Sequence, residues 1–309
     1  VKDENKLNKV IIPSLDITGR FKMIGTILHM DSLLTKKIKQ YKGKIFSACD
    51  AELNKILWSA RFTKKVLSQI KKDIGSIAFQ QEYLNNPIDT TSSLIKREWI
   101  VQCFREDISQ EDVLELEFEM KTLGCDFAFS DRITADDSAY VGLGSKDGFF
   151  YLLGSRSEHG LSLYEQMNII KDELHVKHQY DQIGLEENSI VGISKDIQQW
   201  DLPITLFWTA ANDPANRLKP DYDFFAKRHT VGKINLIMRL GTAFENKKFI
   251  IPYKTEKDKK IADKLLSECI SYALAEGKLV EAGVHPDIPI GMGYALELLN
   301  NYGTVFDFG

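Results

Sequence analysis

The chain has 309 residues, of which 43% are apolar and 27% are charged, and its formal net charge is −4. This length suits one large domain or two of ordinary size, and the apolar fraction is ample for a packed core. The net negative charge excludes a uniformly basic nucleic-acid binder, so any contact with phosphate has to come from local groups of Lys and Arg. No run approaches the ~20 apolar residues of a membrane span, and the polar beginning is unlike a signal peptide, so we expect a soluble protein that is not exported.

The four cysteines, Cys49, Cys103, Cys125 and Cys269, lie far apart and form no CxxC pair. This spacing argues against a zinc ribbon and against a disulfide framework, so we expect reduced thiols. The chain begins at Val rather than Met. We interpret this as the sign of a fragment of a longer protein.

The first third of the chain is expected to be a small α/β part. The apolar run over residues 21–28 predicts a buried strand, and residues 29–43 predict a helix that ends near a glycine. A second short strand is expected over residues 46–49, and residues 57–87 are expected to be mostly helical.

A domain boundary is expected near residue 92. The segment NNPIDTTSS, residues 85–93, collects Asn, Pro, Asp, Thr and Ser, which are residues typical of turns and linkers. The sequence therefore predicts two domains, residues 1–92 and residues 93–309.

The second domain is expected to open with three antiparallel strands. Between Leu123 and Phe129 the large apolar residues alternate with small or polar ones, so Asp126 should point away from the large apolar side chains. Two more apolar runs, Ala139 to Leu143 and Phe149 to Leu153, are joined through Asp-Gly, which favours a hairpin turn. Three sequential strands with an acid in the first predict a ribonuclease-H-like α/β fold.

The rest of the chain alternates between expected helices and strands. Leu163, Met167, Ile170 and Leu174 stand at helical spacing and predict a helix packed on the core. His175 and His178 share the i, i+3 spacing of metal ligands, but we interpret them as surface residues. The further expectations are a strand over 182–185 ending at Glu186, a helix over 189–200, a strand over 202–208, a long polar loop over 209–230, a helix over 231–246, a strand over 247–252, a helix over 256–277, and a last helix after Asp287.

Three acids mark the ends of these elements. Asp126, Glu186 and Asp287 are about 60 and 100 residues apart, so only the fold can bring them together. Mg²⁺ and Mn²⁺ prefer oxygen ligands, and two such ions ~4 Å apart orient a water and stabilise the leaving oxygen of a phosphodiester. Asp137 is a candidate for a further ligand. The alternative is that Glu186 and Asp287 only cap helices and that the acids of the loop, Asp137 among them, are solvated.

At this point the chain resembles the large terminase subunit of tailed bacteriophages, the genome-packaging motor and nuclease. The similarity covers nearly the whole chain and lies in IGTILHMDSLL, in QEYLNNP with its preceding helix, in CDFAFSDRITADDSAYVGLGSKDGFFYLL, in LEENSI, and in HPDIPIGMGYALELL. It implies that residues 1–92 are the end of an ATPase region, and that residues 93–309 are a nuclease domain with a central mixed sheet flanked by helices. Asp126, Glu186 and Asp287 would then be its metal-binding, catalytic acids.

Two departures from the family pattern stand out. Pro286 and Ile290 replace acids that are often present in the last motif, so Asp287 alone must serve that corner of the site. No GxxxxGK[ST] loop is present in the sequence, so we expect no ATP site in this chain.

Basic residues outside the acids are candidates for contacts with DNA phosphates. They are Arg132, Lys219, Lys227, Arg228, Lys233 and Arg239. Such contacts would hold DNA without reading its sequence, and the alternative for each residue is a solvated face. His285 is near Asp287 in the chain and is expected to orient it.

The sequence thus predicts a two-metal endonuclease, using Mg²⁺ or Mn²⁺, that cuts concatemeric double-stranded DNA with little sequence specificity during genome packaging. The resemblance implies a portal protein and a small terminase subunit as partners, no membrane, a monomer in solution that is oligomeric on the capsid, and a place in the host cytoplasm. Two rivals remain: another ribonuclease-H-like nuclease of the resolvase or transposase type, and a non-catalytic docking module of the packaging machine.

Overall fold

A computed structural model describes residues 6–27, 33–41, 43–50, 52–85, 93–128, 137–186, 200–208, 227–230, 232–275, 278–281 and 287–301. The chain divides into two units. The first comprises Val1–Ser92 with Leu274–Lys278, and the second comprises Ser93–Ala273 with Leu279–Gly309. None of the described helices is both long enough and apolar enough to cross a membrane.

The first unit is mainly helical in its described part. Its elements are η1 (Leu7–Ile11), α2 (Leu33–Gln40) and α3 (Lys64–Glu82). Helix α3 begins where the Thr63 side chain accepts a hydrogen bond from the Val66 N–H, and Gly75, at a φ of 79°, kinks it. The described residues 21–27 form no strand, so the buried strand expected there is wrong; Phe21 and Ile24 are exposed.

A small apolar cluster holds the first unit together. Cys49, Leu53, Leu67 and Phe79 are its buried members. Of the strand expected over residues 46–49, only an isolated bridge between Cys49 and Ile56 is present. That the first unit is the end of an ATPase region stays a prediction.

The second unit is a mixed α/β domain, and its elements follow the predicted order closely. Its strands are β1 (Phe104–Arg105), β2 (Met120–Asp126), β3 (Ser138–Lys146), β4 (Phe149–Glu158), β5 (Gln182–Glu186), β6 (Ile204–Trp208), β7 (Lys227–Thr230) and β8 (Phe249–Pro252). Its helices are α4 (Arg97–Val101), α5 (Gln110–Leu114), α6 (Leu163–Asn168), η2 (Ile169–His175), α7 (Val176–His178), α8 (Lys233–Glu245), α9 (Glu256–Cys269) and α10 (Ile288–Asn301). A hairpin of β9 (Tyr272–Ala275) and β10 (Lys278–Glu281) precedes α10 and crosses the division between the units.

Within the described residues the sheet has the strand order β1-β8-β4-β3-β2-β5-β6-β7. The three sequential strands β2, β3 and β4 are antiparallel, and β5 and β6 continue from β2 as parallel neighbours. This is the ribonuclease-H-like arrangement, with the first long strand at the centre. The Asp-Gly turn between β3 and β4 has positive φ angles at Asp147 and Gly148, 52° and 74°, as a type I′ hairpin turn requires.

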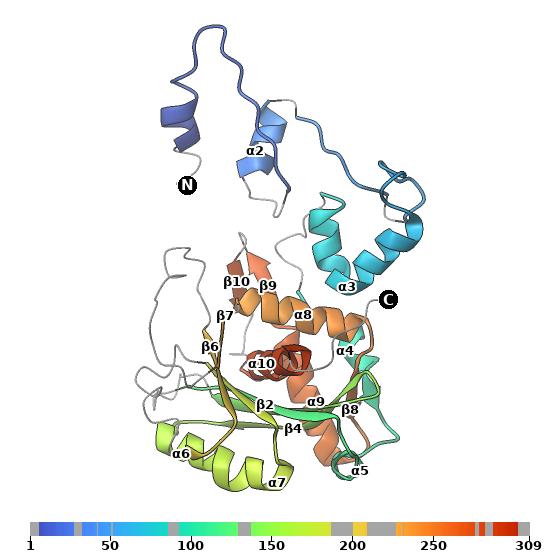
Figure 1. The fold of residues 1–309 in the computed structure, drawn as a ribbon, viewed down its shortest axis with the longest axis vertical. Helices are drawn as coiled ribbons and strands as arrows, with labels where there is room; N and C mark the ends of the chain where they lie inside the picture. The colour runs from blue at the N-terminus through green and yellow to red at the C-terminus, as the bar shows by residue number, and fades with distance from the viewer. Residues whose placement is uncertain are drawn as a thin grey trace. The chain divides into compact units, whose positions relative to one another are not determined.

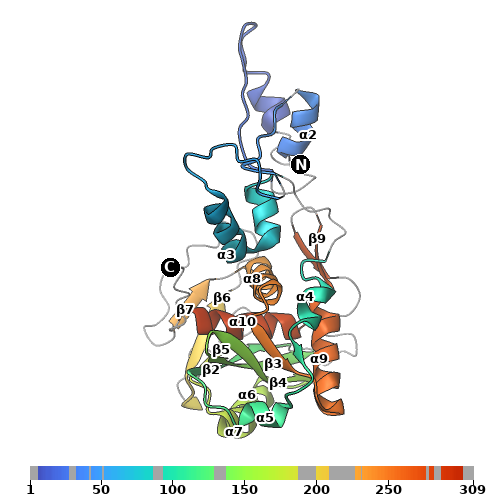
Figure 2. The same cartoon turned by 90° about the vertical axis from the view of Figure 1, so that its right-hand side faces the viewer.

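Helices cover both faces of this sheet. Figures 1 and 2 show α10 against the central strands with α8 beyond it, and α6 and α7 against the opposite face. On the α6 side, the core is built from the alternating residues that the sequence predicted, with Leu123, Cys125 and Phe127 packed against Met167 and Ile170. The other face of β2, which carries Thr122, Gly124 and Asp126, lies under α10. All four cysteines are free, and all four are buried.

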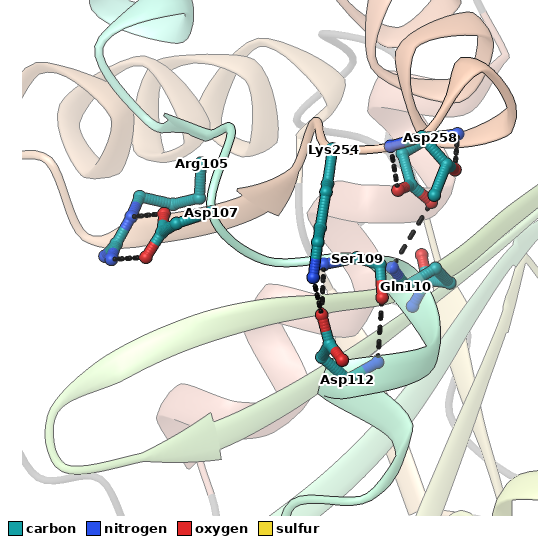
Figure 3. Close-up of polar contacts among 8 residues, drawn as sticks. Arg105, Asp107, Ser109, Gln110, Asp112, Lys254 and Asp258 are labelled. Atoms are coloured by element: carbon teal, nitrogen blue, oxygen red, sulfur yellow. Dashed lines mark hydrogen bonds and ion pairs between the residues drawn. The ribbon is translucent and has the colours of Figure 1, made fainter.

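A polar network joins the first turns of α5 and α9 (Figure 3). Lys254 Nζ donates to Asp112 Oδ2 at 3.0 Å, and Ser109 and Asp112 exchange the two hydrogen bonds of a capping box. The Gln110 N–H donates to Asp258 Oδ1 on α9 at 3.2 Å. The hydrogen bonds from Ser109 and the nearby Lys254 lower the pKa of Asp112 to about 2. The network fixes the start of α9, whose last turn reaches the site described below.

Three expected element boundaries are wrong. The strand predicted to run from Leu123 to Phe129 ends at Asp126, so that acid is at the end of β2 rather than in its middle. The helix predicted over 256–277 ends at Cys269 because the chain turns into the β9–β10 hairpin. Residues 227–230, expected in a loop, form β7 beside β6. For β7, pairing with β6 overrides the local pattern.

Candidate active site

Two parallel neighbours in the sheet bring Asp126 and Glu186 side by side. The register pairs Cys125 of β2 with Leu185 of β5, and Asp126 and Glu186 each follow as the last residue of the strand. Both carboxyls are buried, with Asp126 at 8% and Glu186 at 4% exposure. The two side chains are joined by a hydrogen bond.

The third acid, Asp287, lies just before the helix that covers this face of the sheet. Asp287 directly precedes α10, and its carbonyl oxygen accepts from the Gly291 N–H at 3.2 Å, as the residue before a helix does. Pro289 follows in the first turn, where a proline is tolerated. The helix lies directly on β2 because glycines face each other there: a Cβ at Gly124 would lie 1.9 Å from the Gly291 carbonyl oxygen.

The three acids act on one another electrostatically. Burial raises the pKa of Asp126 well above its ordinary value; Lys233 opposes this, and the carboxyls of Glu186 and Asp287 raise the pKa further. A hydrogen bond between two carboxyl groups needs one proton, which the Asp126–Glu186 pair shares. Residues about 60 and 100 positions apart in the chain therefore share one site.

A lysine completes the charge balance of this site. Lys233, the first residue of α8, places its Nζ 3.4 Å from Glu186 Oε2, and its side chain is 42% exposed. The sequence assigned Lys233 to phosphate contacts only. Lys233 also lies beside the acids, where its charge favours their ionised forms.

The main chain of Asp137 binds the Asp287 side chain. Its N–H donates to Asp287 Oδ2 at 3.0 Å, and its own carboxylate contacts His159 Nδ1 at 3.1 Å. Asp137 is half-exposed. The role of a further ligand predicted for its carboxylate stays a prediction.

The donor chemistry of the site fits a hard divalent ion, but its side chains are not arranged as a ready-made cage. Asp126, Glu186 and Asp287 offer only carboxylate oxygens, the ligands that Mg²⁺ and Mn²⁺ prefer. Within the described ranges, no group of three or more His, Cys, Asp or Glu side chains has the geometry of a metal centre.

The candidate DNA contacts have different outcomes. Arg132, Lys219 and His285 lie outside the described residues, as does the helix expected over 189–200. Lys227 and Arg228 belong to β7, whose side chains are not described. Arg239 forms an ion pair with Glu297 of α10, and its predicted contact with DNA phosphate stays a prediction.

One histidine departs from its expected place. His178 is buried rather than on the surface, with its ring 5.3 Å from that of Tyr180. Burial, aided by Lys177 and Lys121, lowers the pKa of His178 to about 4, so it is neutral in the folded protein at neutral pH.

This burial predicts an acid sensitivity. The pKa of His178 is lower in the folded protein than the unfolded value of about 6.5. The contribution of neutral His178 to the free energy of unfolding is therefore complete above that pH. It is lost as the pH falls toward about 4, and the loss is at most about 3 kcal/mol. His178→Leu is expected to flatten the pH dependence of the free energy of unfolding in this window, measured by urea denaturation. An unchanged pH slope in His178→Leu would contradict the assignment.

Sequence reasoning missed Glu268, the penultimate residue of α9. It is 4% exposed, and its Oε2 accepts a hydrogen bond from the Ile288 N–H at 2.9 Å. An acid beside the apolar positions Leu265 and Cys269 was the one available signal, and it is weak.

The sheet order and the buried acids define the second unit as a ribonuclease-H-like domain with an acidic site at the end of its central strand. Solved structures similar to the chain are large terminases, as the resemblance predicted. A structure of the large terminase from a thermophilic bacteriophage is 10% identical with a TM-score of 0.61, and the match covers 96% of this chain and 66% of that one. Its complex with ATP-gamma-S gives 12% identity, a TM-score of 0.60 and the same coverage.

The likeness is one of fold. A second crystal form of the same terminase is 12% identical with a TM-score of 0.50, and the match covers 79% of this chain and 52% of that one. The chain therefore spans slightly less than two thirds of the length of the first of these structures. No family model matches the chain, and no curated protein matches it.

Proposed function

We propose that this chain is part of a large terminase and that its second unit is the nuclease, which cuts concatemeric double-stranded DNA with little sequence specificity during genome packaging. The observation that carries this proposal is the convergence of Asp126, Glu186 and Asp287 at the end of β2. The shared fold with a phage large terminase supports it.

The three acids would hold Mg²⁺ or Mn²⁺. A pair of such ions, when bound, orients a water and stabilises the leaving oxygen of a phosphodiester. The protein's part is to keep the Asp126 and Glu186 carboxyls buried under α10, where they act in a low dielectric and bind an ion only when deprotonated. Lys233, half in solvent beside Glu186, is placed to meet a DNA phosphate at the rim of the site.

The test is loss of cleavage on removal of either strand acid. Asp126→Ala and Glu186→Ala are each expected to abolish plasmid cleavage in Mn²⁺ while the far-ultraviolet circular dichroism stays native, because each removes a ligand without changing the strand. Glu111→Ala, which removes an exposed acid on α5, is the matched control and should cleave normally. Full activity in Asp126→Ala or Glu186→Ala would refute the proposal. Comparing linear, supercoiled and four-way DNA then separates a terminase nuclease from a junction resolvase.

A docking module is the second candidate. It is favoured by one observation: the Asp126–Glu186 hydrogen bond and the Lys233 contact partly satisfy these acids without any ion. Isothermal titration with Mn²⁺ decides between the two, because a docking module should show no binding that Asp126→Ala removes.

The remaining expectations rest on the resemblance, and we propose them together with the nuclease function. Double-stranded DNA, a portal protein and a small terminase subunit would be the partners. The protein would be a monomer in solution that is oligomeric on the capsid, and it would act in the host cytoplasm.

A further inference from the structure

The start of α10 is held by a side chain from another helix. Glu268, at the end of α9, is buried, and its Oε2 accepts from the Ile288 N–H at 2.9 Å. Ile288 is the first residue of α10, and a first-turn N–H has no partner inside its own helix. A negative charge is also favoured at a helix N-terminus. Glu268 therefore both satisfies this N–H and fixes where α10 begins.

The residue before this anchor is the site acid Asp287. Its carboxylate is held by the Asp137 N–H at 3.0 Å, and its carbonyl oxygen by the Gly291 N–H at 3.2 Å. Because the Glu268 hydrogen bond is made one residue along the chain, it restrains the backbone from which the Asp287 side chain extends.

Glu268 is itself anchored on both sides. Its main-chain carbonyl accepts from the Ser271 hydroxyl at 2.7 Å, and Lys264 Nζ lies 3.8 Å from its Oε1. Burial raises the pKa of Glu268, with a contribution from the charge of Asp137, and the Ile288 N–H and Lys264 oppose this. The carboxyl thus feels the charge of Asp137 and is bound to the main chain of α10 at Ile288.

We propose that Glu268 is a positioning residue, which fixes the first turn of α10 and thereby sets the Asp287 carboxylate in place toward Asp126. Its effect on binding of divalent ions rests on the proposed function. Its effect on the position of Asp287 does not, because the Asp137–Asp287 hydrogen bond reports that position in the metal-free protein.

The experiment measures amide hydrogen exchange at Asp137 in the metal-free protein. Glu268→Met keeps the side-chain size and removes the acceptor of the Ile288 N–H, at an expected cost of about 1–3 kcal/mol in stability. We expect the Asp137 amide to exchange about tenfold faster relative to amides of β4. Glu268→Gln, which keeps an acceptor for the Ile288 N–H, should restore the rate to within about twofold of wild type.

Glu256→Gln is the matched control, since it removes an exposed acid from the other end of the same helix. If Glu268→Met fails to fold, Glu268→Asp, whose carboxylate is one methylene shorter, takes its place. An unchanged relative exchange rate at Asp137 in the folded Met or Asp variant would overturn the proposal.

A second readout joins this inference to the metal. Mn²⁺ binding by calorimetry is expected to weaken about tenfold in Glu268→Met, the scale of effect when a group that orients a ligand is lost. If wild-type protein binds no Mn²⁺, the proposed function fails, while the exchange measurement still decides the positioning role. If Mn²⁺ affinity is unchanged although exchange at Asp137 rises, Glu268 does not set the metal site.

Discussion

Replacing Gly124 by Ala is expected to lower Mn²⁺-dependent cleavage by about a hundredfold and to destabilise the second unit by about 3 kcal/mol. The added Cβ would lie 1.9 Å from the Gly291 carbonyl oxygen and 2.5 Å from the Ala295 nitrogen. Both are main-chain atoms of α10, so no side chain can turn aside to make room. The helix has to move away from β2 as a body, and Asp287 at its start moves with it.

Strand β4 of the same sheet offers a control for this substitution. A Cβ at Gly154 of β4 meets no atom within 4 Å, so Gly154→Ala should leave both cleavage and stability near wild type. Cleavage is measured on plasmid DNA and stability by urea denaturation of the metal-free protein. Normal activity in Gly124→Ala would show that the spacing between α10 and β2 does not set the acidic site.

Asp126→Asn is expected to abolish cleavage and, at the same time, to stabilise the metal-free protein at neutral pH. Asp126 is buried beside two other acids, and its pKa is raised well above the ordinary value of about 4. A carboxyl with a raised folded pKa stabilises the fold fully below its unfolded pKa, and this contribution is lost as the pH rises through the folded pKa. Asn does not ionise, and its amide can still donate a hydrogen bond to Glu186.

The gain should be about 0.5–2 kcal/mol at neutral pH, within the range of substitutions that relieve a strained functional site. Thermal or urea unfolding in EDTA from about pH 5 to about pH 9 measures it, and the variant's advantage should grow toward the alkaline end. Adding Mn²⁺ should then stabilise wild type and not Asp126→Asn, because binding to the folded state alone raises stability. A variant less stable than wild type at every pH would contradict the raised pKa.

Much of the second unit followed from local pattern. The alternation at Leu123, Cys125 and Phe127 predicted both β2 and the face that packs on Met167 and Ile170. The Asp-Gly turn at 147–148 predicted the hairpin of β3 and β4, because few residues other than Gly, Asn and Asp adopt its positive φ angles. Helices α8 and α10 do not depend on strand pairing, and their predicted boundaries were close to the observed ones.

Other features depended on contacts between distant segments. Strand β7 lies where the sequence predicted a loop, because its partner β6 is about twenty residues away in the chain. The burial of His178 and the ion pair of Arg239 with Glu297 likewise gave no local signal. In the first unit, an apolar run over residues 21–27 was mistaken for a buried strand because hydrophobicity alone does not show whether a partner is present.

For the candidate site, the sequence by itself determined which acids are available and that each ends or begins an element: Asp126, Glu186 and Asp287. Only the tertiary structure decided that they meet, because the meeting depends on the parallel register of β2 with β5 and on two facing glycines that seat α10 on the sheet. The tertiary structure also placed Lys233 beside Glu186, and Glu268 beside the first residue of α10. The sequence alone does not predict these contacts of Lys233 and Glu268, because a charged residue on a helix has no fixed partner until the helices pack.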